Sequence, residues 1–226
     1  MKGIIFHSHL GLGDQIGCNG LVHYLHETHK APIHVVTKEK NFANISFLYK
    51  DYPDINPIKI SNNPRSEKGE VEDLSTSLNL NLVRTSITNP LASHWDETHY
   101  TNLGLSYDIK FDFCKLPTIP NEMEILRAHT PFPQPYAFSH INKDGPQPST
   151  ALPIVHNAES LNVFELIPIL KNATELHLMG SSVICLAELM NVPLGSQKCF
   201  HYTFRSVKDF GSPINLRNNP KWSIVM

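Results

Sequence analysis

Long apolar runs are missing from the sequence, and so are closely spaced cysteines and an excess of charge of one sign. No run approaches the roughly 18 consecutive apolar residues that a membrane-spanning helix needs. The 19 Lys and Arg residues nearly balance the 21 Asp and Glu residues, and a net charge of −2 gives no electrostatic footprint for duplex nucleic acid. The four cysteines form no C-x-x-C pair, which excludes a zinc knuckle and a thioredoxin motif.

What is present is ordinary for a globular protein. The 226 residues are 41% hydrophobic, enough for one large domain or two small lobes. The first residues are too short for a signal-peptide core and are predicted to form a strand instead. Cys18 and Cys185 lie in apolar helical patterns and are expected in the core. We therefore expect a cytoplasmic α/β protein.

Strands and helices alternate along the first half of the chain. The pattern favours a parallel sheet built from right-handed βαβ units. Strands are predicted at 4–6, 33–36, 58–60 and, more weakly, 80–84, and helices at 18–25 and 41–50.

Proline interrupts this alternation. Residues 117–153 hold eight of the 17 prolines, which opposes helices and central strands. We interpret this stretch as the crossing between two lobes, 1–130 and 131–226. In the second lobe, strands are predicted at 136–138, 152–155 and 175–179, and helices at 163–170, kinked by Pro168, and 183–190. Leu176 and Leu178 share one strand face, which leaves His177 on the other.

A glycine-rich turn, His9-Leu10-Gly11-Leu12-Gly13-Asp14-Gln15, follows the first strand and precedes a helix. Such a turn presents backbone N–H groups and the positive end of a helix dipole. Asp14 either caps the helix or points beyond the carboxyl edge of the sheet, where α/β proteins bind ligands. The spacing is not G-x-G-x-x-G, so no dinucleotide site is predicted.

A second turn, Gly180-Ser181-Ser182, joins the strand that contains His177 to a helix that contains Glu188. Serine at a helix start, beside free amides, is typical of an anion site. Glu188 follows about two turns later, within reach of a ribose whose phosphate lies at the helix start. The alternative is an ordinary serine cap and an exposed glutamate.

No metal site is predicted. His23, His26 and His29 recur every three residues, whereas zinc ligands on a helix are usually four apart. His7 and His9 near the glycine turn are the more suggestive pair. The D-x-D motif with which many sugar-nucleotide enzymes hold a divalent ion is absent.

Three stretches resemble glycosyltransferases of the two-lobed GT-B type. Residues 9–15 resemble the L-G-D element of the heptosyltransferase kind. Residues 162–182, with Asn172-Ala173-Thr174-Glu175-Leu176-His177, are similar to a second-lobe element of compact viral and bacterial glycosyltransferase-like proteins. Residues 100–105 look like the Y-x-x-L-G segment of that group. Gly180 departs from the pattern, because relatives often have Asp there, and the second lobe is small for a GT-B domain.

The resemblance implies two Rossmann-like lobes with parallel sheets, the donor on the second and the acceptor on the first. It implies that Asp14 is the catalytic base and that a helix N-terminus, without a metal or a cofactor, stabilises the leaving diphosphate. It implies an acceptor or phosphate loop of Gly11, Gly13 and Gln15. The donor-binding residues that it implies are His140, His177, Gly180, Ser181, Ser182 and Glu188. The chemistry of His177 is also compatible with a purely structural role.

The leading hypothesis is a metal-independent glycosyltransferase that moves a sugar from a nucleotide-sugar donor to a hydroxyl acceptor. That acceptor could be a glycan, a lipid-linked glycan or, in a virus, a modified DNA base. A sugar-nucleotide epimerase or hydrolase is the alternative among enzymes, and it would act on the nucleotide sugar without an acceptor. A non-catalytic nucleotide- or glycan-binding module would bind nucleoside diphosphate without turnover.

Overall fold

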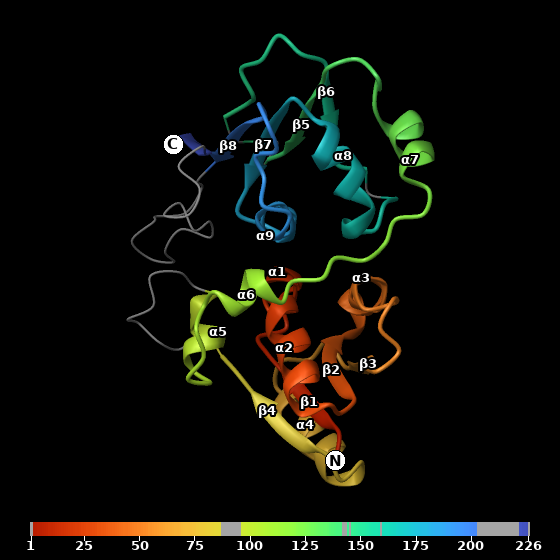
Figure 1. Ribbon diagram of the computed structural model, residues 1–226, viewed down its shortest axis with the longest axis vertical. Helices are drawn as coiled ribbons and strands as arrows, with labels where there is room; N and C mark the ends of the chain where they lie inside the picture. Colours follow the sequence, from red (N-terminus) through yellow and green to blue (C-terminus); the bar gives the residue numbers. More distant parts are fainter. Residues whose placement is uncertain are drawn as a thin grey trace. The chain divides into compact units, whose positions relative to one another are not determined.

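The chain divides into two units, each built around its own parallel sheet (Figure 1). The computed structural model describes residues 2–86, 96–141, 144, 146–158, 160–202 and 222–225. The division falls between Thr118 and Ile119, earlier than the boundary at residue 130 expected from the sequence. The reason is α7 (Glu122–His129), which packs against α8 (Ile167–Asn172) of the second unit.

The first unit has a four-stranded sheet in the order β3-β2-β1-β4, with every neighbouring pair parallel. Its described elements, in chain order, are β1 (Ile4–His7), α1 (Leu12–Gly17), α2 (Asn19–His29), β2 (Ile33–Lys38), η1 (Glu39–Asn41), α3 (Phe42–Leu48), β3 (Ile55–Ile60), α4 (Glu67–Ser77), β4 (Asn81–Arg84), α5 (Glu97–Thr101) and α6 (Ile109–Asp112).

Helices cover both faces of this sheet. The connections from β1 to β2 and from β2 to β3 step in one direction, so right-handed crossovers place α1, α2 and α3 on one face. The step from β3 to β4 runs back past two strands and places α4 on the other face. There Val71 of α4 packs with Ile5, Val36 and Ile60 of the sheet. All four parallel strands end at the same edge, from which the loop to Asp14 emerges.

The second unit has a five-stranded parallel sheet in the order β6-β5-β7-β8-β9. Its remaining described elements are β5 (Ala137–His140), β6 (Ile154–His156), η2 (Val163–Leu166), β7 (Glu175–Met179), α9 (Ser182–Leu189), β8 (Lys198–Tyr202) and β9 (Trp222–Val225). The steps from β6 to β7 and from β7 to β8 share a direction, so α8 and α9 lie on one face. The expected α/β fold with two parallel sheets is confirmed.

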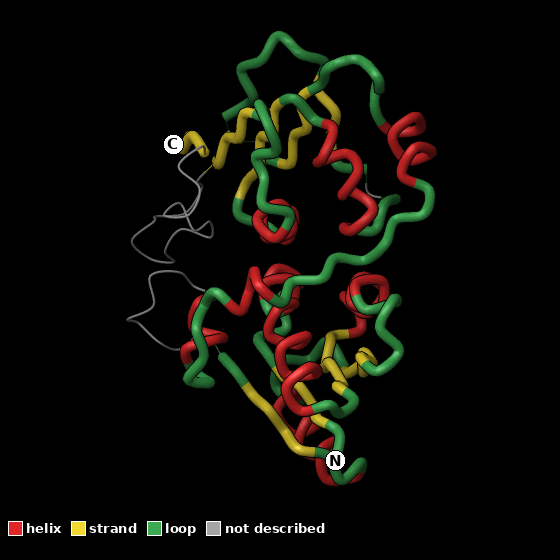
Figure 2. Tube along the Cα trace, in the orientation of Figure 1, coloured by secondary structure: helices red, strands yellow, loops and turns green. Residues whose placement is uncertain are grey.

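The described residues of the proline-rich stretch are mostly loop, as Figure 2 shows around α7 and β5. α7 fits between Pro120 and Pro131, where no proline interrupts it. Pro168 stands in the first turn of α8, where a missing N–H is tolerated, and the predicted kink is the change from η2 to α8.

Cys18 and Cys185 are buried as expected, and none of the four cysteines forms a disulfide bond. Within the described residues, no helix has both the length and the apolar character that crossing a membrane requires.

Candidate active site at the first turn and the anion site of the second unit

Asp14 lies in the first turn of α1, but it does not cap that helix. The N-cap residue is Gly11, in extended conformation, and α1 has no side-chain cap hydrogen bond. The Asp14 carboxylate instead faces back along the turn, where its Oδ2 lies 2.8 Å from Nδ1 of His9. An ionised carboxylate can only accept, so the His9 Nδ1–H donates this bond and Nε2 carries the lone pair.

Gly11 is required by space and not by backbone conformation. Its φ of −67° and ψ of 145° suit any residue. A Cβ built on Gly11, however, would overlap Asp14 Oδ2 and would lie 3.6 Å from His9 Nδ1. The turn therefore brings His9 and Asp14 together only because position 11 has no side chain.

His99 reaches the same carboxylate from a distant part of the chain. Thr85, the residue after β4, donates from its hydroxyl to the His99 carbonyl at 2.8 Å. The Tyr100 hydroxyl donates to the carbonyl of Gly17 at 2.7 Å and fixes α5 against α1. These two bonds place His99 Nε2 at 3.7 Å from Asp14 Oδ1, an ion-pair distance.

The three side chains of this cluster differ in exposure: Asp14 and His99 are buried, and His9 is exposed. Asp14 is 8% exposed and His99 is fully buried. The His9 side chain, in contrast, is 62% exposed. His9 is thus the member of the cluster that solvent or a ligand can reach.

The electrostatics follow from this geometry. Burial alone would raise the pKa of Asp14, but the facing His9 and His99 rings outweigh it and hold that pKa below its usual range. The hydrogen bond from His9 to Asp14 raises the pKa of His9. Burial alone would lower the pKa of His99, but Cys18 and Asp14 beside it raise it to about 10. The pKa of Asp14 is thus lowered and that of His99 is raised, and both directions favour an ion pair between them.

The other predicted members of this loop have different environments. Gly13 is half-buried within α1. Gln15 is 2% exposed, and its side-chain amide donates to the Val36 carbonyl and accepts from the Thr37 hydroxyl, both at 2.8 Å. Gln15 therefore ties α1 to β2, and its side chain does not share the His9–Asp14 cluster.

A charged network lies at the same sheet edge, on the side of α4. His7 Nε2 is 3.1 Å from the Glu67 carboxylate, and Arg84 Nε donates to His7 Nδ1 at 3.0 Å. Lys38 pairs with Glu67 at 3.2 Å. His7 and His9 thus take separate partners and do not converge. Across the described residues, no group of three or more His, Cys, Asp or Glu side chains is arranged to hold a metal ion.

In the second unit, Ser181 is the N-cap residue of α9 by backbone position, but its hydroxyl makes no cap hydrogen bond. Ser181 Oγ is a buried atom with no hydrogen-bond partner among the described residues. A hydroxyl left unsatisfied beside helix N–H groups is suited to an anion. Ser182 begins the helix, Gly180 is exposed, and Glu188 is half-buried near its end.

The two predicted donor histidines lie on opposite faces of the second sheet. His140 pairs in register with Leu178 and therefore shares its face, whereas His177 points to the other. His177 is 1% exposed, stacks on Phe200 at 4.6 Å, and its Nδ1 is 2.8 Å from the Tyr202 hydroxyl. His140 is half-buried, and burial lowers its pKa. The two rings therefore have different surroundings, and the His177 ring is already engaged by Phe200 and Tyr202.

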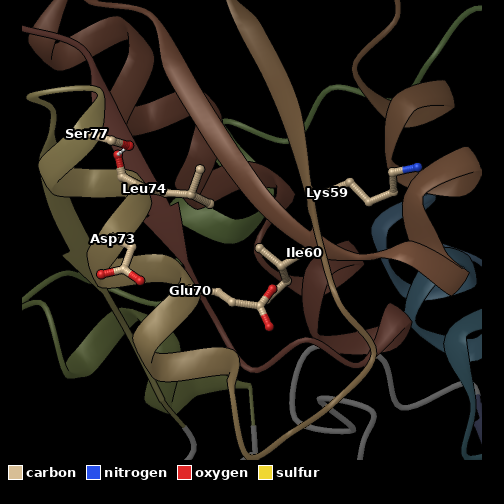
Figure 3. Close-up of a pocket in the computed structure, with 6 residues that line it drawn as sticks. All are labelled: Lys59, Ile60, Glu70, Asp73, Leu74 and Ser77. Atoms are coloured by element: carbon tan, nitrogen blue, oxygen red, sulfur yellow. Dashed lines mark hydrogen bonds between the residues drawn. The ribbon is translucent and has the colours of Figure 1, made fainter.

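A surface depression lies between β3 and α4 (Figure 3). It is lined by Lys59, Ile60, Glu70, Asp73, Leu74 and Ser77. The Glu70 carboxylate that faces it accepts from the Ser61 backbone N–H at 2.9 Å and from the hydroxyls of Ser61 and Ser66. Lys59 points away from the depression (Figure 3). Glu70 therefore ties α4 to Ser61, the residue that follows β3.

Comparison with solved structures places this fold in a class of proteins. No known family matches the sequence, and no curated protein matches it significantly. Solved structures do match, and the fold is that of heptosyltransferase-like, GT-B-type glycosyltransferases, as the sequence predicts.

Two structures carry this conclusion. A glycosyl transferase of family 9 from Veillonella parvula matches with a TM-score of 0.61 and 10% identity, over 99% of this chain and 86% of that protein. The ADP-heptose LPS heptosyltransferase II of Escherichia coli matches with a TM-score of 0.60 and 12% identity, over 100% of this chain and 90% of that protein.

Sequence reasoning missed His99 as a member of the cluster and treated His9 only as one of a histidine pair. A signal for His9 exists, because it stands five residues before Asp14 across a tight glycine turn. No comparable signal exists for His99. Its position depends on the tertiary bonds of Thr85 and Tyr100.

Proposed function

We propose that the chain is a glycosyltransferase that moves a sugar from a nucleoside-diphosphate sugar to a hydroxyl acceptor. The observation that carries the proposal is the position of Asp14, a buried carboxylate held at the carboxyl edge of the first sheet with two histidines on it. A hydroxyl attacking a sugar must lose a proton, and a positioned base supplies roughly 10² to 10⁴ in rate. Acceptor deprotonation in this proposal depends on Asp14.

The donor side of the proposal rests on Ser181 and α9. The departing diphosphate carries growing negative charge, and helix N–H groups with a serine hydroxyl are suited to stabilise it. Ser181 Oγ has no other described partner to satisfy it. Glu188, about two turns further along α9, is proposed to face the ribose. With amides and hydroxyls on the diphosphate, transfer requires no divalent metal and no cofactor.

His140, Gly180 and Ser182 complete the proposed donor site, and His177 is the weaker member because its ring is already engaged by Tyr202 and Phe200. Gly11 and Gly13 let a substrate approach the backbone of the first turn. Four cysteines without a disulfide suit a reducing compartment, so we place the reaction in the cytoplasm.

The experiment has two stages. Nucleoside diphosphates and nucleotide sugars are first screened by thermal shift, beginning with ADP-heptose, which the name of one structural neighbour specifies. The stabilising donor is then incubated with glycans, lipid-linked glycans and hydroxylated nucleobases, and the products are weighed by mass spectrometry. An acceptor heavier by one sugar supports the proposal. Nucleoside diphosphate released equally without acceptor identifies a hydrolase, an isomerised sugar identifies an epimerase, and binding without turnover identifies a binding module.

A further inference from the structure

We propose that His9, and not Asp14, is the group that removes the proton from the acceptor, and that Asp14 is the positioning residue behind it. The inference rests on the proposed glycosyltransferase function and specifies its base. It follows from which side chain of the cluster an incoming hydroxyl can touch.

Access is the first argument. Asp14 is 8% exposed, and its Oδ2 already accepts the His9 Nδ1–H at 2.8 Å. Its Oδ1 faces the fully buried His99 at 3.7 Å. The two rings therefore flank this carboxylate and leave its side chain only 11% exposed. The His9 side chain is 62% exposed, and its Nε2 has no hydrogen-bond partner among the described residues.

Orientation is the second argument. Asp14 fixes His9 in the tautomer with a proton on Nδ1, which leaves the Nε2 lone pair pointing away from the carboxylate. Gly11 holds the pair together because any side chain there would occupy the space of Asp14 Oδ2. A buried carboxylate, an oriented imidazole and an exposed basic nitrogen form the arrangement that a general base needs.

Proton affinity agrees with the geometry. The two facing rings depress the pKa of Asp14, which makes its carboxylate a weak base near neutrality. The bond to Asp14 raises the pKa of His9, opposed by partial burial and by the positive charges of His99 on α5 and Lys38 on β2. An ordinary imidazole already holds a proton roughly 10² times more tightly than an ordinary carboxylate, and these shifts widen the difference.

Sugar transfer couples deprotonation of the acceptor to departure of the diphosphate. The acceptor oxygen attacks the anomeric carbon and forms the new C–O bond, while its proton passes to His9 Nε2. The bond from the anomeric carbon to the diphosphate oxygen breaks, and its electron pair leaves with the nucleoside diphosphate. His9 becomes an imidazolium that donates from Nδ1 to Asp14, and it later returns the extra proton to water.

The first test is NMR titration of His9 in the wild type and in Asp14→Asn, with no substrate present. The pKa of His9 is expected to fall in the variant, because the carboxylate that stabilises the imidazolium is gone. The ring signals of the exposed His29, at the end of α2, serve as the internal reference. An unchanged pKa of His9 in Asp14→Asn would contradict the His9–Asp14 hydrogen bond, whether or not the protein transfers sugar.

The second test is the pH profile of turnover on the full chain. His9→Gln is expected to lower turnover by roughly 10² to 10⁴, with His29→Gln as the matched control at wild-type rate. Wild-type turnover should rise with pH as His9 loses its proton, and the residual activity of Asp14→Asn should rise at lower pH. A His9→Gln enzyme with wild-type turnover overturns the inference and leaves the proposed function standing. Absence of transfer by the wild type overturns the proposed function, and the NMR result still decides the pair.

Discussion

The Asp14 carboxylate fills the space that a side chain at Gly11 would need, because its Oδ2 lies where a Cβ of residue 11 would be. The backbone of Gly11 has an ordinary extended conformation, so the requirement for glycine is one of space alone. The His9–Asp14 hydrogen bond therefore depends on glycine at position 11. A substitution at that position tests this dependence and leaves both His9 and Asp14 unchanged.

Gly11→Ala is expected to displace the Asp14 carboxylate while the fold is kept. Turnover should fall by about tenfold or more, since misplaced groups lose the benefit of orientation. Gly69→Ala is the matched control, because a Cβ there has nothing within 4 Å and glycine within α4 costs roughly 1 kcal/mol relative to alanine. Gly69→Ala should raise the melting temperature slightly at unchanged turnover. Wild-type turnover in Gly11→Ala would show that the carboxylate position is unimportant.

Replacement of Ser181 and Ser182 by Ala tests the proposed anion site. Each hydrogen bond to a charged group is worth roughly 1.5–3 kcal/mol, so binding of nucleoside diphosphate should weaken at least about tenfold. Binding of the nucleoside alone should change less. Because Ser181 makes no cap bond, the single variant Ser181→Ala should not lower the melting temperature. Calorimetric titration with both ligands measures the contrast, and equal weakening of both would refute a phosphate site here.

His99 makes stability depend on pH on the alkaline side. Its pKa in the folded protein is raised to about 10, whereas an unfolded histidine titrates near about 6.5. The folded state therefore binds more protons between these values, and the free energy of unfolding should fall as pH rises through that window. His99→Gln should flatten this dependence in urea unfolding at pH 6.5 to 10. A slope identical to that of the wild type would contradict a buried His99–Asp14 ion pair.

Metal removal tests the chemistry assigned to the leaving group. Because α9 amides and Ser181 are proposed to hold the diphosphate, EDTA is expected to leave donor binding and transfer largely intact. The measurement is turnover after dialysis against EDTA, with Mg²⁺ or Mn²⁺ added back to a parallel sample. Strict dependence on either ion would contradict this assignment and would require metal ligands to be sought again among the histidines near the first turn.

Apolar patterning predicts much of the fold. The strands predicted at 4–6, 33–36, 136–138 and 175–179 overlap β1, β2, β5 and β7, and the helical stripe with Cys18 and Leu25 is plain in the sequence. The apolar pattern does not predict α4, because this helix is mostly polar and only Val71 among its residues is buried. It does not predict β8 and α7 either, since Lys198–Tyr202 mixes polar and apolar residues and Glu122–His129 lies within the proline-rich stretch.

The candidate site was predictable only where it is local. The glycine turn identifies Asp14, and the serine turn identifies Ser181. The partner His99 comes from α5, whose placement depends on bonds to β4 and α1 that no local pattern encodes. Likewise, alternation along β7 predicts that His177 and Leu178 lie on opposite faces of the sheet. Only the pairing of β5 with β7 shows that His140 lies on the same face as Leu178.

The most direct test of the account is acceptor-dependent release of nucleoside diphosphate by the wild type and by Asp14→Asn. The control is Asp73→Asn, which alters an exposed carboxylate on α4. Asp14→Asn is expected to keep the wild-type circular dichroism spectrum and to bind the donor, yet to lose turnover by a factor of about 10² or more. Asp73→Asn should be fully active. Near-wild-type turnover in folded Asp14→Asn would contradict the account.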